Sequence, residues 1–346
     1  MNSFTRDNQS TFVSVILASF NGQSFIEKQL DSILNQTHPH LELLVVDDGS
    51  NDQTLEIVIE YSKHDERVRI FPTHINQGLV KNFERGLKLT KGEFIVLADQ
   101  DDIFHRDKIE KQLALLSKKP DLDIVISDLE LIDERNNSIS ASMWKFQGIN
   151  SSPRFPFKNL AIDNYATGCT IMFRRRLLDS VLPFPPELRI HDQWLAIVAA
   201  REHGGGIGVI NETLTKYRQH HGNVIGAKHT NKRGLNDIRK KLFSLSELKM
   251  LRQQSSRLFN EKRLRVSSFL ERRELFSRTE IRYLESLESL FLIFSGVSNK
   301  GLWHRIFSLP KALYFSFYAR SFLQTFSRFV VLTIPQKSNQ LKTHLK

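Results

Sequence analysis

Three carboxylates fall within four residues, at Asp99, Asp101 and Asp102, directly after an apolar run. Like charges this close repel one another, and a bound divalent cation relieves that repulsion. Hard oxygen ligands suit Mg²⁺ or Mn²⁺, which in turn favour a substrate with phosphate oxygens. A solvated acidic loop in front of a helix that starts at Arg106 is the alternative interpretation. The cluster by itself is compatible with either a metal site or a helix cap.

A second acidic turn follows another apolar run, where Asp47 and Asp48 precede Gly49 and Ser50. Gly49 tolerates a positive φ, and Ser50 and Asp52 have side chains that cap helices. A purely structural turn accounts for those three residues. It does not require two adjacent carboxylates before them, so Asp47 and Asp48 are candidate binding residues.

Strands and helices must position these side chains. Short β-rich runs alternate with amphipathic helical patterns in the first hundred residues, and we expect strands at 12–17, 41–46, 68–71 and 93–98 with helices at 24–34, 51–61 and 79–89. This alternation predicts parallel βαβ units. Open α/β sheets bind ligands beyond the carboxyl ends of their strands, so both acidic groups are expected at that edge.

The pattern is mixed beyond Pro120. We expect a loop at 138–156, a helix at 192–202 and strands at 124–127, 167–173, 207–210 and 214–217. Arg174, Arg175 and Arg176 form either a solvated helix start or a clamp for a diphosphate, because guanidinium groups match phosphate geometry. A domain boundary is expected near Ala227.

The chain has 346 residues, enough for one large α/β domain and an appended region. Its single cysteine, Cys169, excludes an intramolecular disulfide and favours a reduced, cytoplasmic setting. The first ten residues are polar and do not match a signal peptide. No run reaches the ~18 apolar residues of a membrane-spanning helix.

The positive charge is concentrated in the last third. Residues 1–227 hold 25 Lys and Arg against 30 Asp and Glu, whereas residues 228–346 hold 24 against 8, a net +16. Nucleic-acid binding is disfavoured because no recognition motif is present. Two interpretations stay open: a solvated helical subdomain, or binding to an anionic membrane surface on the inner face of the cytoplasmic membrane. The second is favoured by aromatic residues at helical spacing, Phe315, Tyr318, Phe322, Phe326 and Phe329.

Four short motifs then follow one another along the chain: Ala18-Ser19-Phe20-Asn21, Val46-Asp47-Asp48-Gly49-Ser50, Asn76-Gln77-Gly78 and Ala98-Asp99-Gln100-Asp101-Asp102. In this order and spacing they resemble the inverting family 2 glycosyltransferases of GT-A fold. Later segments resemble the family's second acidic motif and its Arg-x-His segment, at Ile190-His191-Asp192-Gln193-Trp194 and Tyr217-Arg218-Gln219-His220. The resemblance covers residues 11–227 and is nearest to bacterial rhamnosyltransferase-like members that build surface polysaccharides such as O-antigen.

The resemblance implies a GT-A catalytic domain over 1–227, with a nucleotide-sugar half at 11–128 and an acceptor half at 129–227, followed by a basic helical region at 228–346. The base of a dTDP- or UDP-linked donor would be bound by Asp47 or Asp48, and Asp99 would lie near the ribose. The implied donor-binding residues are Ala18, Ser19, Asn21, Asp47, Asp48, Asn76, Gly78, Asp99, Gln100 and Asp101.

The resemblance also implies a metal site and a catalytic base. Asp101, with Asp102, and His220 would ligate Mn²⁺ or Mg²⁺, although the adjacent His221 leaves the choice of histidine open. Asp192 would be the general base that activates an acceptor hydroxyl, a role that typically contributes ~10²–10⁴-fold in rate. The alternative for Asp192 is a carboxylate stabilised by a helix N-terminus, and for His191 a capping or packing role.

The expected activity is therefore transfer of a sugar, with rhamnose as one candidate, to a hydroxyl of a glycan or lipid-linked acceptor. A non-catalytic protein on the same fold and another nucleotide enzyme, such as a nucleotidylyltransferase, are the alternatives. The sequence contains neither a Gly-x-Gly-x-x-Gly turn after its first strand nor a P-loop. Dehydrogenases and P-loop enzymes are disfavoured for that reason.

Overall fold

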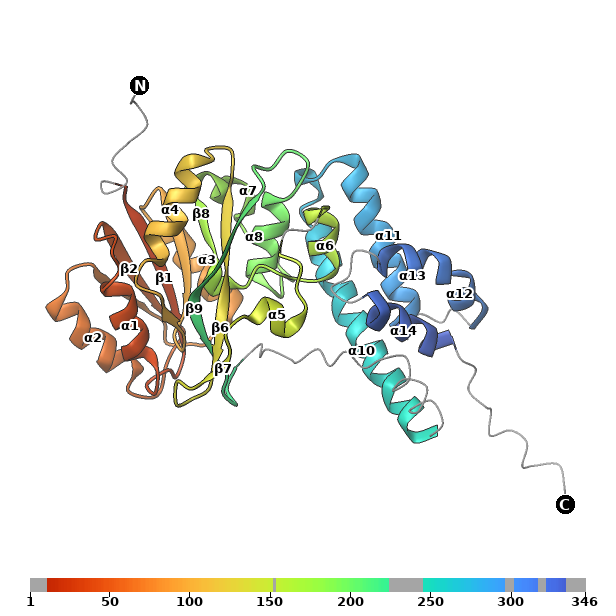
Figure 1. Ribbon diagram of the computed structural model, residues 1–346, viewed down its shortest axis with the longest axis horizontal. Helices are drawn as coiled ribbons and strands as arrows, with labels where there is room; N and C mark the ends of the chain where they lie inside the picture. The colour runs from red at the N-terminus through yellow and green to blue at the C-terminus, as the bar shows by residue number, and fades with distance from the viewer. Residues whose placement is uncertain (1–10, 152–153, 224–244, 296–301, 317–321, 334–346) are drawn as a thin grey trace, which may run out of the picture. The chain divides into compact units, whose positions relative to one another are not determined.

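The computed structural model describes residues 11–151, 154–223, 245–295, 302–316 and 322–333 (Figure 1). The chain forms two compact units. The first contains residues 1–230 and 272–280, and the second contains residues 231–271 and 281–346. The boundary expected near Ala227 lies outside the described residues.

The first unit is built on one mixed sheet. Its N-terminal half consists of four parallel strands in the order β3-β2-β1-β4, namely β1 (Val13–Ser19), β2 (Leu41–Asp47), β3 (Val68–Pro72) and β4 (Phe94–Asp99). Five more strands extend it within the described residues: β5 (Ile103–Phe104), β6 (Ile124–Ile132), β7 (Ser138–Ser140), β8 (Met172–Arg174) and β9 (Ile207–Arg218). Strand β8 is antiparallel to both β4 and β6, whereas β9 is parallel to β6.

Helices cover the parallel half of the sheet because its strands place apolar side chains on both faces. One face packs against α1 (Ile26–Leu34), α2 (Thr54–His64) and α4 (Lys108–Lys118), and Val13, Val15 and Leu17 belong to that core. Helix α3 (Leu79–Leu89) packs against β1 and β2 as well. Each fully buried aliphatic side chain contributes ~1.5–3 kcal/mol, so this core holds the strand ends in fixed register.

The second half of the unit departs from the expected pattern in three places. Residues 138–156 contain β7 and α5 (Met143–Gln147) in addition to loop, and α6 (Pro156–Ile162) starts at their end. The strand expected at 167–173 is a 3₁₀ turn, η2 (Gly168–Thr170), followed by the short β8. The two strands expected at 207–210 and 214–217 are one strand, β9, whose register with β6 shifts at a bulge.

Turn η2 forms because buried side chains bind its carbonyl groups. Lys108 Nζ and Thr215 Oγ1 donate to the Cys169 carbonyl oxygen at 3.0 and 3.1 Å, and Gln112 Nε2 donates to the Thr170 carbonyl oxygen at 2.7 Å. These carbonyls are therefore unavailable for a strand ladder. The apolar pattern alone did not indicate this competition.

Residues 272–280 cross back to the first unit, and we call this segment the strap. It packs beside α8 (His191–Ala199), which follows α7 (Leu178–Val181) and is buried along its whole length. The Phe276 ring lies edge-on to Trp194 and Phe157, with centroids 6.2 and 5.7 Å apart. Glu280 Oε1 accepts a hydrogen bond of 2.7 Å from the Glu202 backbone N–H. The strap is thus part of the core around α8.

The second unit is helical within the described residues. Its helices are α10 (Leu245–Leu270), α11 (Arg278–Phe294), α12 (Leu302–Phe307), α13 (Leu309–Ser316) and α14 (Phe322–Thr333). The expectation of one aromatic stripe on a single helix is wrong, because Phe315 ends up in α13 and Phe329 in α14. Both side chains are buried, and Phe329 stacks on Phe259 at 4.2 Å. Tyr318 lies outside the described residues.

The described helices do not reach the length and apolar character that crossing a bilayer requires.

Candidate functional site

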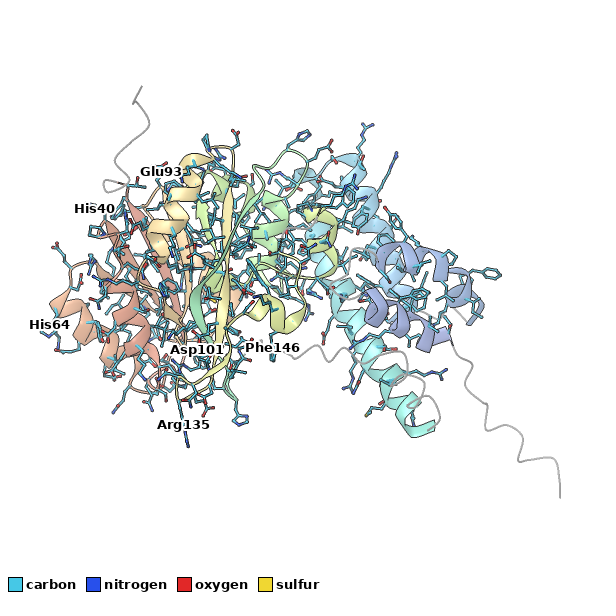
Figure 2. All side chains as sticks on the ribbon, viewed as in Figure 1. His40, His64, Glu93, Asp101, Arg135 and Phe146 are labelled. Carbon is cyan, nitrogen blue, oxygen red and sulfur yellow. The ribbon has the colours of Figure 1, made fainter. Side chains whose placement is uncertain are left out.

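The carboxyl ends of three neighbouring strands meet at one edge of the sheet. Parallel pairing places Ser19 of β1 opposite Asp47 of β2, and Ala18 opposite Asp99 of β4. Figure 2 shows Asp101 at this end of the sheet and Glu93, the residue before β4, at the other. The two acidic groups therefore share an edge, as the strand pattern predicted.

The Asp47 side chain is hydrogen-bonded within the turn that follows β2. Its carboxylate accepts hydrogen bonds from the Ser19 and Ser50 hydroxyls at 2.8 and 2.5 Å and from the backbone N–H groups of Gly49 and Ser50 at 3.1 and 2.9 Å. Only 1% of the residue is exposed. Four donors fill the usual acceptor sites of a carboxylate, so Asp47 fixes the turn.

Asp48 ties the same turn to the loop before α3. Its oxygens accept one hydrogen bond each, from the Gln77 N–H at 2.9 Å and the Gly78 N–H at 2.8 Å. Gly78 adopts φ 91°, a left-handed conformation that favours glycine, and Asn76 Oδ1 also accepts from its N–H. These two contacts occupy half of the acceptor sites of a carboxylate.

The residues after β1 form the rim of the edge. Asn21, at φ 50°, accepts a hydrogen bond of 2.8 Å from the Asn51 N–H through its side-chain oxygen. The Gln100 amide makes a pair of hydrogen bonds with the Phe20 backbone, 2.8 Å to its N–H and 2.9 Å to its carbonyl. Asn21 and Gln100 thus fix the path of the chain between β1 and its two neighbours.

Asp101 lies against His220. The Asp101 Oδ2 and His220 Nε2 atoms are 2.6 Å apart, and each side chain is 14% exposed. His221 is exposed, so the structure brings the first histidine of the pair to the acidic cluster. The Phe25 ring covers the imidazole, with centroids 5.0 Å apart.

Asp102 points into the protein. It is fully buried and accepts a hydrogen bond of 3.2 Å from the Arg218 backbone N–H. Burial, followed by the charges of Asp101 and Asp99, raises its pKa well above the ordinary value. Asp99, Asp102 and Cys169 form a group of three possible metal ligands among the described residues, with ligand atoms within 4.8 Å of one another. Asp102 is therefore grouped with Cys169 and not with the Asp101–His220 pair.

The charges of two other carboxylates act on Asp99. Burial raises its pKa to about 7, with further contributions from the charges of Asp101 and Asp192. Asp101 belongs to the metal side predicted from the sequence, and Asp192 is the predicted base. Asp99 thus connects these two parts of the site.

Asp192 lies in the first turn of α8 and is 8% exposed. Its Oδ1 accepts a hydrogen bond of 2.9 Å from Asn164 Nδ2, and its Oδ2 accepts one of 2.9 Å from the Gly168 N–H. Sequence reasoning missed Asn164, because nothing local marks a residue that acts on a carboxylate 28 positions later. Both halves of the unit contribute to this edge.

The His191 side chain packs inside the protein. Its ring stacks on Phe83 with centroids 4.1 Å apart, and burial lowers its pKa to about 3. The imidazole is thus neutral at physiological pH. This arrangement agrees with the packing role that was the alternative for His191.

Sequence reasoning named Arg218 only as part of the Arg-x-His segment and did not predict its buried role. It is fully buried, and its guanidinium donates to the Asp101 carbonyl at 2.8 Å, the Asp133 carbonyl at 3.0 Å and Asn136 Oδ1 at 2.7 Å. The guanidinium carbon lies 4.8 Å from the centre of the Phe25 ring. Arg218 therefore holds the acidic loop, residues 99–102, from its buried side.

The three consecutive arginines do not form a diphosphate clamp. Arg175 Nε donates to the Gly92 carbonyl, just before β4, and Arg176 Nε pairs with Asp123 Oδ1 at 2.8 Å. Arg174 also donates to backbone carbonyls. These contacts lie before β4 and before β6, and the start of β4 is at the edge opposite the acidic groups.

Known proteins are similar to this chain in sequence and in fold. The family model for glycosyl transferase family 2 matches residues 14–182. The UDP-Glc:alpha-D-GlcNAc-diphosphoundecaprenol beta-1,3-glucosyltransferase WfgD of Escherichia coli is 31% identical over 190 residues, which are 54% of this chain and 69% of WfgD. The putative teichuronic acid biosynthesis glycosyltransferase TuaG of Bacillus subtilis is 28% identical, over 61% of this chain and 80% of TuaG.

An uncharacterized glycosyltransferase of Haemophilus influenzae is 36% identical, but the match spans only 44% of its length. The crystal structure of S. aureus TarS 1–349 in complex with UDP superposes with a TM-score of 0.52 at 18% identity, over 93% of this chain and 89% of the TarS 1–349 chain. That likeness concerns the fold, which is GT-A. The family model and the relatives agree, and the chain belongs to glycosyl transferase family 2.

Proposed function

We propose that this chain is an inverting glycosyltransferase that moves a sugar from a nucleoside diphosphate donor to a hydroxyl of a cell-surface polysaccharide or its lipid-linked precursor. The observation that carries the proposal is the grouping of carboxylates in the first unit: Asp101 lies 2.6 Å from His220, and the charge of Asp192 acts on Asp99, the last residue of β4. Direct transfer requires a donor site and an acceptor-activating base within one site. Membership of glycosyl transferase family 2 supports the same reaction class.

On the donor side, Asp48 is the better candidate for recognition of the base. Asp47 already accepts four hydrogen bonds, whereas Asp48 accepts two. A carboxylate with spare acceptor sites is able to bind the imide N–H of a uracil or thymine base. The remaining donor-site residues proposed here are Ala18, Ser19, Asn21, Asn76, Gly78, Asp99 and Gln100.

Asp101 and His220 fit a divalent cation. The two side chains are partly exposed and share a hydrogen bond of 2.6 Å that a cation would replace, and a mixed oxygen and nitrogen set suits Mn²⁺ better than Mg²⁺, which prefers oxygen ligands alone. When bound, the cation supplies Lewis-acid stabilisation of the negative charge on the diphosphate leaving group. Asp102 supports the loop from its buried side, in place of the ligand role first expected for it.

Asp192 is proposed to take the proton of the acceptor hydroxyl as that oxygen attacks the anomeric carbon. A single displacement of this kind inverts the anomeric centre. General-base catalysis contributes ~10²–10⁴-fold in rate. The donors from Asn164 and Gly168 keep the carboxylate in one orientation.

The relatives narrow the donors and acceptors to test. The name of WfgD specifies UDP-Glc as donor and a GlcNAc-diphosphoundecaprenol acceptor, and the name of TuaG refers to teichuronic acid. We therefore propose a UDP-linked sugar first and dTDP-rhamnose second, with a diphosphate-lipid-linked sugar as acceptor.

The test uses the full-length chain with UDP-glucose, UDP-GlcNAc and dTDP-rhamnose, with and without Mn²⁺, on a GlcNAc-diphosphate-lipid acceptor. We expect transfer with inverted anomeric configuration, read by NMR of the product. Asp192→Asn should retain donor binding and lose transfer, whereas Asp121→Asn, an exposed control, should transfer normally. Retained configuration, or full transfer by Asp192→Asn, would contradict the mechanism.

We further propose that the second unit binds the anionic inner face of the cytoplasmic membrane. Support comes from the 24 basic residues against 8 acidic ones in residues 228–346 and from exposed aromatic residues, Phe307 at 78% and Tyr314 at 46%. A basic residue near anionic headgroups contributes ~1 kcal/mol. The full-length chain should float with anionic vesicles and not with zwitterionic ones.

Phe307→Ser should weaken this flotation, and Ile59→Ser, an equally drastic change on an exposed residue of α2, should leave it unchanged. Equal flotation of the parent chain with both vesicle types would refute the membrane proposal.

A further inference from the structure

One short segment holds the carboxylate of Asp192 at both oxygens. Residues 163–168 connect α6 to η2, and they supply the Asn164 side chain to Oδ1 and the Gly168 N–H to Oδ2, each at 2.9 Å. Neither of these two donors belongs to α8, which carries Asp192 itself and whose Gln193 backbone N–H also donates to Oδ1 at 2.6 Å. Contacts from outside its own helix therefore contribute to the orientation of this carboxylate.

The Asn164 amide has only one orientation that satisfies both of its ends. Its Oδ1 accepts a hydrogen bond of 3.0 Å from the Ala166 backbone N–H. An amide oxygen accepts and an amide nitrogen donates, so the NH₂ group must be the end that faces Asp192. A rotated amide would place its oxygen against a carboxylate oxygen and its NH₂ against an N–H. The local backbone thus presents a donor to the proposed base.

We propose that Asn164 is a positioning residue for the general base Asp192: it fixes the rotamer of the carboxylate and favours its ionised form. The inference rests on the proposed function for the identity of the base. Asn164 does not take part in the proton transfer itself, and its effect passes through Asp192.

The charges around Asp192 explain why such a donor is needed. Asp99 faces it with a like charge, His191 beside it is neutral, and the first turn of α8 contributes the positive end of a helix dipole. Asp192 is also buried, and a buried carboxylate beside a like charge needs hydrogen-bond donors to act as a base. Hydrogen bonds to the ionised form oppose both effects.

Two substitutions separate the contributions of geometry and charge. Asn164→Ala removes the side-chain donor to Oδ1 and retains the backbone N–H donors of Gln193 and Gly168. Asn164→Asp places a second carboxylate where the donor was, 2.9 Å from Oδ1, so that repulsion is added to the loss. Asn35→Ala is the matched control, because Asn35 Nδ2 makes a similar bond of 2.8 Å, to the Asp31 carbonyl, at the exposed end of α1.

The experiment measures kcat, the Kd of the nucleotide sugar and the pH dependence of kcat in the full-length variants. Asn164→Ala should lower kcat on the order of 10–100-fold, as is usual for groups that orient a reacting residue. The donor Kd should not change, and the acidic limb of the pH profile should move to higher pH. Asn164→Asp should show larger effects in the same direction, and Asn35→Ala should match the parent.

A second readout does not depend on turnover. The Asp192 carboxyl carbon is followed by NMR as pH varies, with Asp192→Asn used to assign its resonance. We expect a higher pKa of Asp192 in Asn164→Ala than in the parent. An unchanged pKa, or a parent-like kcat and pH profile, would overturn the assignment of Asn164.

Failure of the proposed function has a different signature. In that case the parent chain itself transfers no sugar from any donor, while the NMR titration still reports whether Asn164 controls the ionisation of Asp192.

Discussion

Replacing Arg218 with methionine tests whether a buried cation supports the acidic loop. The guanidinium bonds the carbonyls of Asp101 and Asp133 and the side chain of Asn136, and it lies on the Phe25 ring. Methionine fills most of the same volume but donates no hydrogen bond. Four acceptors lose this donor, counting the Glu134 carbonyl at 3.3 Å, and the Asp102 carboxylate loses a nearby positive charge.

The magnitude follows from burial. Each hydrogen bond from a charged donor contributes ~1.5–3 kcal/mol net, but these bonds are not additive because the fully buried guanidinium is itself costly to desolvate. Removing one partner from a buried charged network costs ~3–5 kcal/mol, and we expect that loss in the free energy of unfolding. With an m-value of ~2 kcal/mol/M, the urea midpoint should fall by about 2 M.

Urea denaturation followed by circular dichroism checks this expectation. Arg135→Met is the control, since Arg135 is exposed (Figure 2) and should stay within ~0.5 kcal/mol of the parent. Arg218→Lys keeps the charge without the planar fork and should fall between the two. If Arg218→Met unfolds at the same urea concentration as the control, the buried hydrogen bonds do not stabilise the loop and the reasoning is refuted.

Three further outcomes are expected. Burial lowers the His191 pKa to about 3, so the unfolded state binds more protons than the folded state between pH 3 and about 6.5. The free energy of unfolding should therefore fall with decreasing pH in this range, at up to ~1.4 kcal/mol per pH unit. His191→Phe should reduce that slope in urea titrations. Phe276→Ala should cost ~3–5 kcal/mol in the same assay, and a loss below ~1 kcal/mol would show that the strap contributes little. In calorimetric titrations with Mn²⁺ and UDP, Asp101→Ala and His220→Ala should weaken metal binding, whereas His221→Ala should not; equal effects of both histidines would contradict the assignment.

The parallel half of the sheet was predictable because its signals are local. Apolar residues alternate with helical patterns up to β4, and each acidic group directly follows a strand. A carboxylate at a strand end needs no tertiary information to be placed at the edge. What Asp47 and Asp48 do there was not predictable, because it depends on how many donors the turn and the loop at Gln77 present to each.

The second half was harder to predict because long-range polar contacts determine it. Turn η2 replaces a strand only because Lys108, Gln112 and Thr215 reach its carbonyls from other elements. Asn164 and Arg218 acquire their roles in the same way, through partners 28 and more than 80 residues away in sequence. Hydropathy and residue spacing do not predict such contacts.

The strap has a consequence for synthesis on the ribosome. The first unit is built mainly from residues up to 230, but Phe276 and Glu280 complete its core only after the intervening segment has been made. At ~5–20 residues per second, the stretch of about fifty residues takes on the order of 3–10 s. During that interval the nascent chain presents Trp194 and Phe157 without their aromatic neighbour. A pause in translation there would therefore prolong exposure of these rings to chaperones and proteases.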